Sequence, residues 1–144
     1  MPGINVIVSG HPNAALTRQL VEQLTQLTCD VLKKERSRTR VIVQYVPADQ
    51  WFVAGRSLAE EGRNSFQLEV TITGETNTRS EKADYHKAAY ELLAGLLGNV
   101  HPHSSIHVAD CRPTAYGYGG VTQEWRYQHC LLYTSPSPRD QRGS

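Results

Sequence analysis

The sequence has no excess of charge of either sign and no long hydrophobic run. Its 144 residues include 15 Lys and Arg against 14 Asp and Glu, so the basic surplus typical of nucleic-acid-binding proteins is missing. No apolar run approaches the roughly 20 residues that a membrane-spanning helix needs, and we expect no signal peptide before Pro2. These absences predict no nucleic-acid partner, no membrane partner and a cytoplasmic location.

Cysteine is scarce as well. The three cysteines, Cys29, Cys111 and Cys130, form no CxxC spacing and are odd in number, which argues against a disulfide framework and fits a reducing compartment. Histidines gather at 101–107, and with Cys111 they invite a zinc interpretation. A proline separates two of these histidines in a loop, so their side chains do not converge as zinc ligands must. The sequence predicts no metal site.

What the sequence does contain is a strand-helix-strand pattern in its first half. Residues 4–8 are mostly apolar, and Asn13 precedes a long stretch with apolar residues at three-to-four spacing up to Val31. Residues 39–46 are rich in β-branched side chains and are stopped by Pro47. We expect two parallel strands joined by a helix, because strands connected through a helix of this length normally run parallel.

The same pattern repeats in the second half. Residues 65–73 alternate strictly between apolar and polar, Thr78 and Glu81 form a capping-box pattern before a second helix, and residues 105–109 supply a closing strand. The helix is expected to end at Gly98.

The spacing of the two halves indicates a duplication. An offset of 65 residues separates Trp51 from Tyr116, and the same offset separates the two helix caps. We therefore predict one α/β (α+β) domain of two tandem β-α-β units, residues 2–63 and 64–129. Together the units form a four-stranded sheet with both helices on one face.

Pro2 carries the clearest chemical signal. A proline is small enough for the initiator Met to be removed, which would leave a secondary amine at the chain terminus. Desolvation or a nearby cation lowers the pKa of such an amine towards neutrality, where it can act as a general base. The plain alternative is a proline at the start of an edge strand, where the missing N–H costs nothing.

The order of these features resembles the tautomerase superfamily, typified by 4-oxalocrotonate tautomerase. The N-terminal Pro2, the β-α-β unit, Arg40 at the start of the second strand and the aromatic-X-X-X-Gly hairpin at Trp51 carry this resemblance. Two such units resemble the fused, double-length members, including the cis-3-chloroacrylic acid dehalogenase group. The resemblance implies a tautomerase/MIF-like fold, a homotrimer whose sheets face inward, a small carboxylate substrate and no cofactor.

The resemblance also implies a composite active site. Pro2 and Arg79 would be the catalytic residues, with Pro2 as the base and Arg79 of the second unit binding the substrate carboxylate. A second cation would be Arg40 or, by alignment of the units, His107, and the sequence leaves this choice open. Trp51 would wall the pocket and exclude water. The plain alternatives are a solvated charge for Arg40 and a core or interface anchor for Trp51.

Other positions depart from the dehalogenase pattern. Tyr118, Thr76 and Thr28 stand where that type has a water-activating carboxylate, an arginine and a histidine. Without the carboxylate, hydration loses its general base, although Glu124 could replace it if the C-terminal segment folds back. Tyr118 is kept as a substrate-binding candidate.

The sequence thus favours a tautomerase that catalyses a 1,3-proton shift in a small enol or α-keto carboxylate. One alternative is a hydratase or dehalogenase of an unsaturated or 3-haloacrylic acid, with a cationic Pro2. Another is a non-catalytic ferredoxin-like ligand-binding module, which predicts an antiparallel sheet. Residues 130–144 include a Ser- and Pro-rich stretch and resemble a translated sequencing adapter, so we expect a non-native or disordered tail there.

Overall fold

One four-stranded sheet organises the chain, of which the computed structural model describes residues 2–74 and 76–133. The strands β1 (Gly3–Ser9), β2 (Arg40–Val46), β5 (Phe66–Thr73) and β6 (Ser105–Cys111) lie in the order β2-β1-β5-β6. β1 runs parallel to β2 and β5 runs parallel to β6, whereas the two units meet through the antiparallel pair β1 and β5. This mixed sheet confirms the expected fold class and differs from the antiparallel sheet of the ferredoxin-like alternative.

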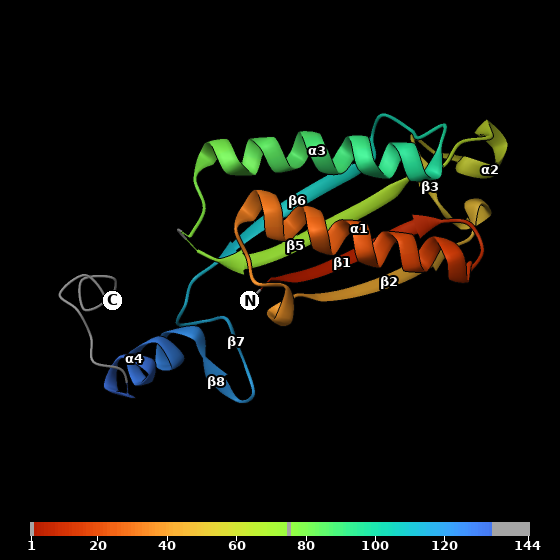
Figure 1. Ribbon diagram of the computed structural model, residues 1–144. Coiled ribbons are helices and arrows are strands. Elements are labelled where there is room, and N and C mark those ends of the chain that lie inside the picture. The colour runs from red at the N-terminus through yellow and green to blue at the C-terminus, as the bar shows by residue number, and fades with distance from the viewer. Residues whose placement is uncertain (1, 75, 134–144) are drawn as a thin grey trace.

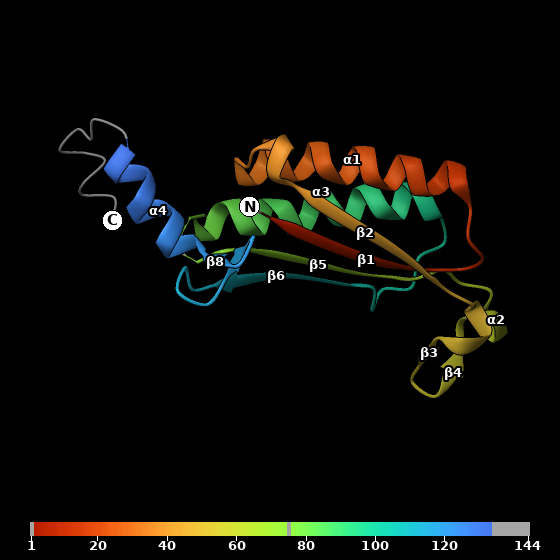
Figure 2. The ribbon, with the colours of Figure 1, turned by 90° about the horizontal axis from the view of Figure 1, so that it is seen from below.

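Two long helices cover the same face of the sheet. α1 (Ala14–Leu32) and α3 (Arg79–Leu97) lie side by side on that face (Figures 1 and 2). The side chain of Asn13 caps α1, and Thr78 and Glu81 form the predicted capping box at the start of α3. Both helices therefore begin where the sequence predicts.

The core lies between the helices and the sheet. Side chains alternate along the strands, and those on the helix side of β1 and β5 are buried and apolar. Within this layer the hydroxyls of Thr28 and Tyr85 share a hydrogen bond of 2.8 Å, which satisfies both buried groups. The buried core consists of Ile4, Val6, Val8, Leu20, Leu24, Leu32, Phe66, Leu68, Val70, Ile72, Tyr85, Ala89 and Leu93.

Each unit ends in a short hairpin followed by a helix. β3 (Phe52–Val53) and β4 (Arg56–Ser57) precede α2 (Leu58–Glu61), and β7 (Gly117–Tyr118) and β8 (Val121–Thr122) precede α4 (Gln123–Tyr133). Two 3-10 turns, η1 (Arg36–Arg38) and η2 (Ala48–Gln50), flank β2. The carbonyl of Trp51 accepts from Leu58 N at 2.9 Å, and that of Tyr116 accepts from Gln123 N at 2.7 Å. The two hairpins are thus closed in the same way at equivalent positions.

The two hairpins lie at opposite ends of the sheet. Figures 1 and 2 show β3, β4 and α2 at one end, and the N-terminus with β7, β8 and α4 at the other. α4 takes in residues 130–133, which the sequence assigned to the tail, while residues 134–144 lie outside the described part of the chain. Across the described residues, no helix is long and apolar enough to cross a membrane.

Candidate active site

The sheet topology brings segments of both units to one end of the fold. Because β1 runs antiparallel to β5, the start of β1 lies beside the end of β5, and Gly3 pairs with Thr71. Gly3 also pairs with Arg40 at the start of β2. The end of β6 joins the same end of the sheet through the pair Thr73 and Cys111. The start of the first unit therefore meets the end of the second.

Pro2 is buried at this end, directly before β1. Its carbonyl oxygen accepts a hydrogen bond of 3.2 Å from the backbone N–H of Arg40. The Arg40 side chain reaches Gly3 of β1. A Cβ added to this glycine would lie only 3.2 Å from Cζ of the Arg40 guanidinium. Arg40 is thus the sequence-predicted cation that the chain itself brings beside Pro2.

Arg79 is the first residue of α3 and is exposed. α3 follows β5, so its N-terminus lies at the end of the sheet where β5 finishes and β1 begins. The equivalent first residue of α1 is Ala14, which carries no charge and follows the other end of β1. Within one chain, Pro2 of the first unit and Arg79 of the second therefore lie at the same end of the sheet. A composite site needs this arrangement.

His107 lies elsewhere on the sheet. β6 begins at Ser105, so this serine occupies the position equivalent to Arg40, and His107 lies two residues further along. His107 is exposed and pairs with Glu69, which in turn pairs with Asn5. Within one chain it therefore lies on an edge strand, level with the middle of β1 rather than with its start.

Trp51 lies at the end of the sheet opposite Pro2. It follows β2, which runs parallel to β1, and it precedes the hairpin whose Phe52 is 57% exposed. If Trp51 lines the Pro2 site, this tryptophan must therefore belong to a second subunit. Its equivalent in the second unit, Tyr116, follows β6 and so lies at the Pro2 end.

Tyr116 is the residue that the sequence-based site omitted. Burial raises the pKa of its phenol, the charge of Arg40 opposes this rise, and Cys111 adds to it. Cys111 ends β6 just before the segment that carries Tyr116, and Arg40 begins β2 at the same end of the sheet. The offset of 65 residues from Trp51 was the signal in the sequence that pointed to this position.

Tyr118 is engaged by a side chain of α4. The Arg126 guanidinium carbon lies 3.8 Å from the centre of the Tyr118 ring, and Arg126 Nη2 donates to the Tyr118 carbonyl at 2.7 Å. Glu124 is exposed in the first turn of α4. Thr28 is buried in the core with its hydroxyl bonded to Tyr85, so it is not presented to a substrate.

A polar network fixes the start of α3. Lys34 Nζ donates to Thr76 Oγ1 at 2.8 Å, which ties the segment after α1 to the turn before α3. Burial lowers the pKa of the Lys34 ammonium, and the charges of Glu81 and Asp110 oppose this shift. The network therefore holds the helix turn that carries Arg79.

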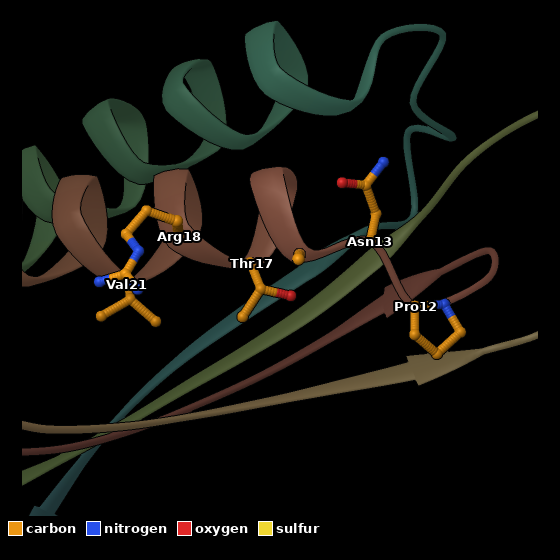
Figure 3. A pocket seen from close by; sticks show the side chains of 6 residues that line it. Pro12, Asn13, Thr17, Arg18 and Val21 are labelled. Atoms are coloured by element: carbon orange, nitrogen blue, oxygen red, sulfur yellow. The ribbon is translucent and has the colours of Figure 1, made fainter.

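Two hollows of the single chain have linings that do not include Pro2. One of about 690 Å³ opens at the start of α1 (Figure 3) and is lined by Pro12, Asn13, Ala14, Thr17, Arg18 and Val21. Another of about 290 Å³ lies on the sheet face opposite the helices and is lined by Asn5, Ile7, Ile42, Gln44, Gln67 and Glu69. Among residues 2–74 and 76–133, no cluster of three or more His, Cys, Asp and Glu side chains is arranged to hold a metal ion.

The first unit is similar in sequence to known proteins. A family model described as a tautomerase enzyme matches residues 5–61. The curated protein "Probable tautomerase K2" of Dickeya dadantii (strain 3937) is 36% identical over 61 residues, which make up 42% of this chain and 91% of that protein.

Solved structures are similar over most of the chain. A native fused 4-OT matches with a TM-score of 0.72 at 23% identity, covering 85% of this chain and 97% of that one. An asymmetric trimer of the R7 fused 4-OT matches with a TM-score of 0.75 at 18% identity, covering 86% and 98%. A macrophage migration inhibitory factor-like protein from Entamoeba histolytica reaches 0.65 at 12% identity, covering 84% and 97%. This likeness in fold includes both units.

Proposed function

This chain belongs to the tautomerase family, and we propose that it catalyses a 1,3-proton shift in a small enol or α-keto carboxylate with Pro2 as the general base. Family membership supports tautomerase-type activity. The observation that supports this site is the meeting of Pro2, Arg40 and the start of α3 at one end of the sheet.

The base in this proposal is the secondary amine that Pro2 presents once Met1 is removed. Pro2 is buried beside Arg40, and both desolvation and a neighbouring cation disfavour a protonated amine. The neutral nitrogen takes the hydroxyl proton of the enol, and the O–H electron pair becomes part of the new carbonyl bond. The former C=C pair then accepts the same proton from the prolyl ammonium, which restores the base.

The two arginines provide the anion-binding part of the site. Arg79 binds the substrate carboxylate, for which a guanidinium offers paired N–H donors. Arg40 lies across Gly3 beside the base and stabilises the negative charge that develops on the substrate oxygen. His107, in the middle of β6, has less support for this role within one chain.

The proposed active form is a homotrimer. Structurally similar fused 4-OT proteins are described as symmetric and asymmetric trimers. On the sheet face opposite the helices, Ile42 is 47% exposed in the single chain, which is the kind of side chain that a subunit contact covers. Trp51 would then complete the Pro2 site from a neighbouring subunit, and Tyr118 would line its rim.

Hydration or dehalogenation has less support. Thr28 is buried against Tyr85, and Arg126 lies over the ring of Tyr118, so neither position provides a group that activates water. Of the positions considered for a base, only Glu124 carries a carboxylate.

The proposal is tested with enol-phenylpyruvate and enol-oxaloacetate as probes, whose ketonisation is followed by ultraviolet absorbance. Pro2→Gln places a large side chain after Met1, so Met1 is retained and the prolyl amine is lost. We expect kcat/KM to fall by about 10²- to 10⁴-fold. Pro102→Gln, in an exposed loop, is the matched control and should retain activity. Equal activity of Pro2→Gln and the unmodified chain would overturn the proposal.

A further inference from the structure

A tight turn after β6 places Tyr116 at the Pro2 end of the sheet. β6 ends at Cys111, which pairs with Thr73 at the end of β5. The backbone N–H groups of Ala115 and Tyr116 both donate to the carbonyl of Arg112, at 2.9 and 3.0 Å. This tight turn keeps Tyr116 next to the end of the sheet.

The strand order relates Tyr116 to Arg40 and Pro2 along that end of the sheet. Cys111 belongs to β6 and Arg40 to β2, and these are the two edge strands of the sheet. Neighbouring strands lie about 4.8 Å apart, so the edge strands are separated by roughly 14 Å. The Arg40 guanidinium bridges part of this span because it lies over Gly3. The end of β6, from which the turn carries Tyr116, is therefore two strand spacings, roughly 10 Å, from the start of β1, where Pro2 precedes the strand.

We propose that the Tyr116 hydroxyl is a catalytic group that donates a hydrogen bond to the substrate oxygen on which negative charge develops as Pro2 moves the proton. The hydroxyl keeps its own proton throughout, so it stabilises the enolate without being a base or an acid. This inference rests on the proposed function of the Pro2 site.

The environment of Tyr116 suits a neutral donor. The side chain is half-buried, and burial keeps the phenol protonated well above neutral pH. Arg40 shares the same region, so a guanidinium and a hydroxyl both face the developing oxyanion. Trp51, the equivalent residue of the first unit, lies at the opposite end of the sheet and has no hydroxyl.

The test compares Tyr116→Phe with Tyr90→Phe. Tyr90 loses the same hydroxyl from a half-buried ring, which packs on Phe66 at a centroid distance of 5.6 Å near the opposite end of the sheet. With enol-phenylpyruvate as the probe, we expect Tyr116→Phe to lower kcat about 100-fold and to change KM by less than about 3-fold, because an oxyanion donor acts mainly in the transition state. Tyr90→Phe should retain kcat. An unchanged kcat in Tyr116→Phe overturns the proposal.

A second variant separates catalysis from structure. Site-specific replacement of Tyr116 by 3-fluorotyrosine keeps the shape of the ring but lowers the pKa of the phenol. We expect the high-pH limb of the kcat profile to move to lower pH, which a purely structural tyrosine would not cause, and an unmoved limb counts against the proposal even if Tyr116→Phe fails to fold. If Pro2→Gln is inactive while both Tyr116 variants behave like the unmodified chain, the proposed function stands and this inference fails.

Discussion

The backbone N–H of Arg40 donates a 3.2 Å hydrogen bond to the carbonyl of Pro2. This contact is the first step of the parallel ladder between β1 and β2, in which Gly3 is paired with Arg40. The ladder thus fixes the start of β2 beside the chain terminus, and the Arg40 side chain extends over Gly3. The position of the cation next to the proposed base follows from strand register rather than from a flexible loop.

Gly3→Ala tests this close approach. The added Cβ would collide with the Arg40 guanidinium, and because the guanidinium is the mobile end of its side chain it should swing away while the strand remains in place. We expect kcat/KM for enol-phenylpyruvate to fall about 10-fold or more, through loss of a charge-assisted contact worth roughly 1.5–3 kcal/mol. Steady-state kinetics measure the loss of kcat/KM, and circular dichroism shows whether the fold is retained.

Gly95→Ala is the matched control for this substitution. Gly95 lies inside α3, and a Cβ there meets nothing within 4 Å. Alanine should stabilise the helix by about 0.5–1 kcal/mol and leave kcat/KM unchanged. If Gly3→Ala retains full activity, Arg40 has no role in the site.

Arg79→Ala should weaken catalysis without unfolding the protein. Arg79 is exposed at the first position of α3, and the helix cap is made by Thr78 and Glu81 rather than by Arg79. Loss of its contact to the substrate carboxylate, worth roughly 1.5–3 kcal/mol, should lower kcat/KM by about 10- to 150-fold. Arg18→Ala, an exposed arginine of α1, removes the same charge and should have no such effect. Identical kinetics for both variants would show that Arg79 does not bind the substrate.

Stability at alkaline pH should depend on Tyr85. Burial raises the pKa of this phenol from 10.0 to about 12, and the hydrogen bond with Thr28 opposes the rise. The folded chain keeps the proton to higher pH than the unfolded chain, so the contribution is complete below pH 10 and is lost as pH rises towards 12. This loss amounts to about 2–3 kcal/mol.

Urea unfolding between pH 8 and 11.5 measures the effect. Tyr85→Phe should be less stable than the unmodified chain at pH 8 by about 1 kcal/mol or more, because Thr28 loses its buried partner. The same variant should show a shallower decline of the free energy of unfolding above pH 10. Tyr90→Phe provides the comparison and should keep the full decline. Parallel pH profiles for all three chains would refute the assignment.

The fold could be predicted from the sequence because the patterns that mark its strands and helices involve residues close together in the chain. The alternation from Phe66 to Thr73, the cap at Asn13 and the capping box at Thr78 each depend on residues close in the chain, and all are found in the structure. The 65-residue offset correctly predicted two equivalent units. Parallel pairing within each unit followed from the length of the connecting helix.

The arrangement of the site depends on relations that local signals do not contain. Sequence alone does not state that β1 meets β5 in antiparallel fashion, which puts the second hairpin rather than the first at the Pro2 end. Tyr116 was therefore overlooked in favour of Trp51. The sequence started the closing strand at Ser105 but aligned His107 with Arg40, and the strand bounds show that Ser105 is the residue equivalent to Arg40.

A nitrogen-15 titration of the prolyl amine, in protein labelled at proline, shows whether Pro2 is a neutral base at the pH of catalysis. Intact mass must first show that the chain begins at Pro2. If Pro2 is the base, the pKa of this amine lies below that of free proline, and kcat/KM for enol-phenylpyruvate rises with pH through the same pKa. An amine that titrates like free proline, in a protein whose activity does not follow that titration, would show that Pro2 is not the base.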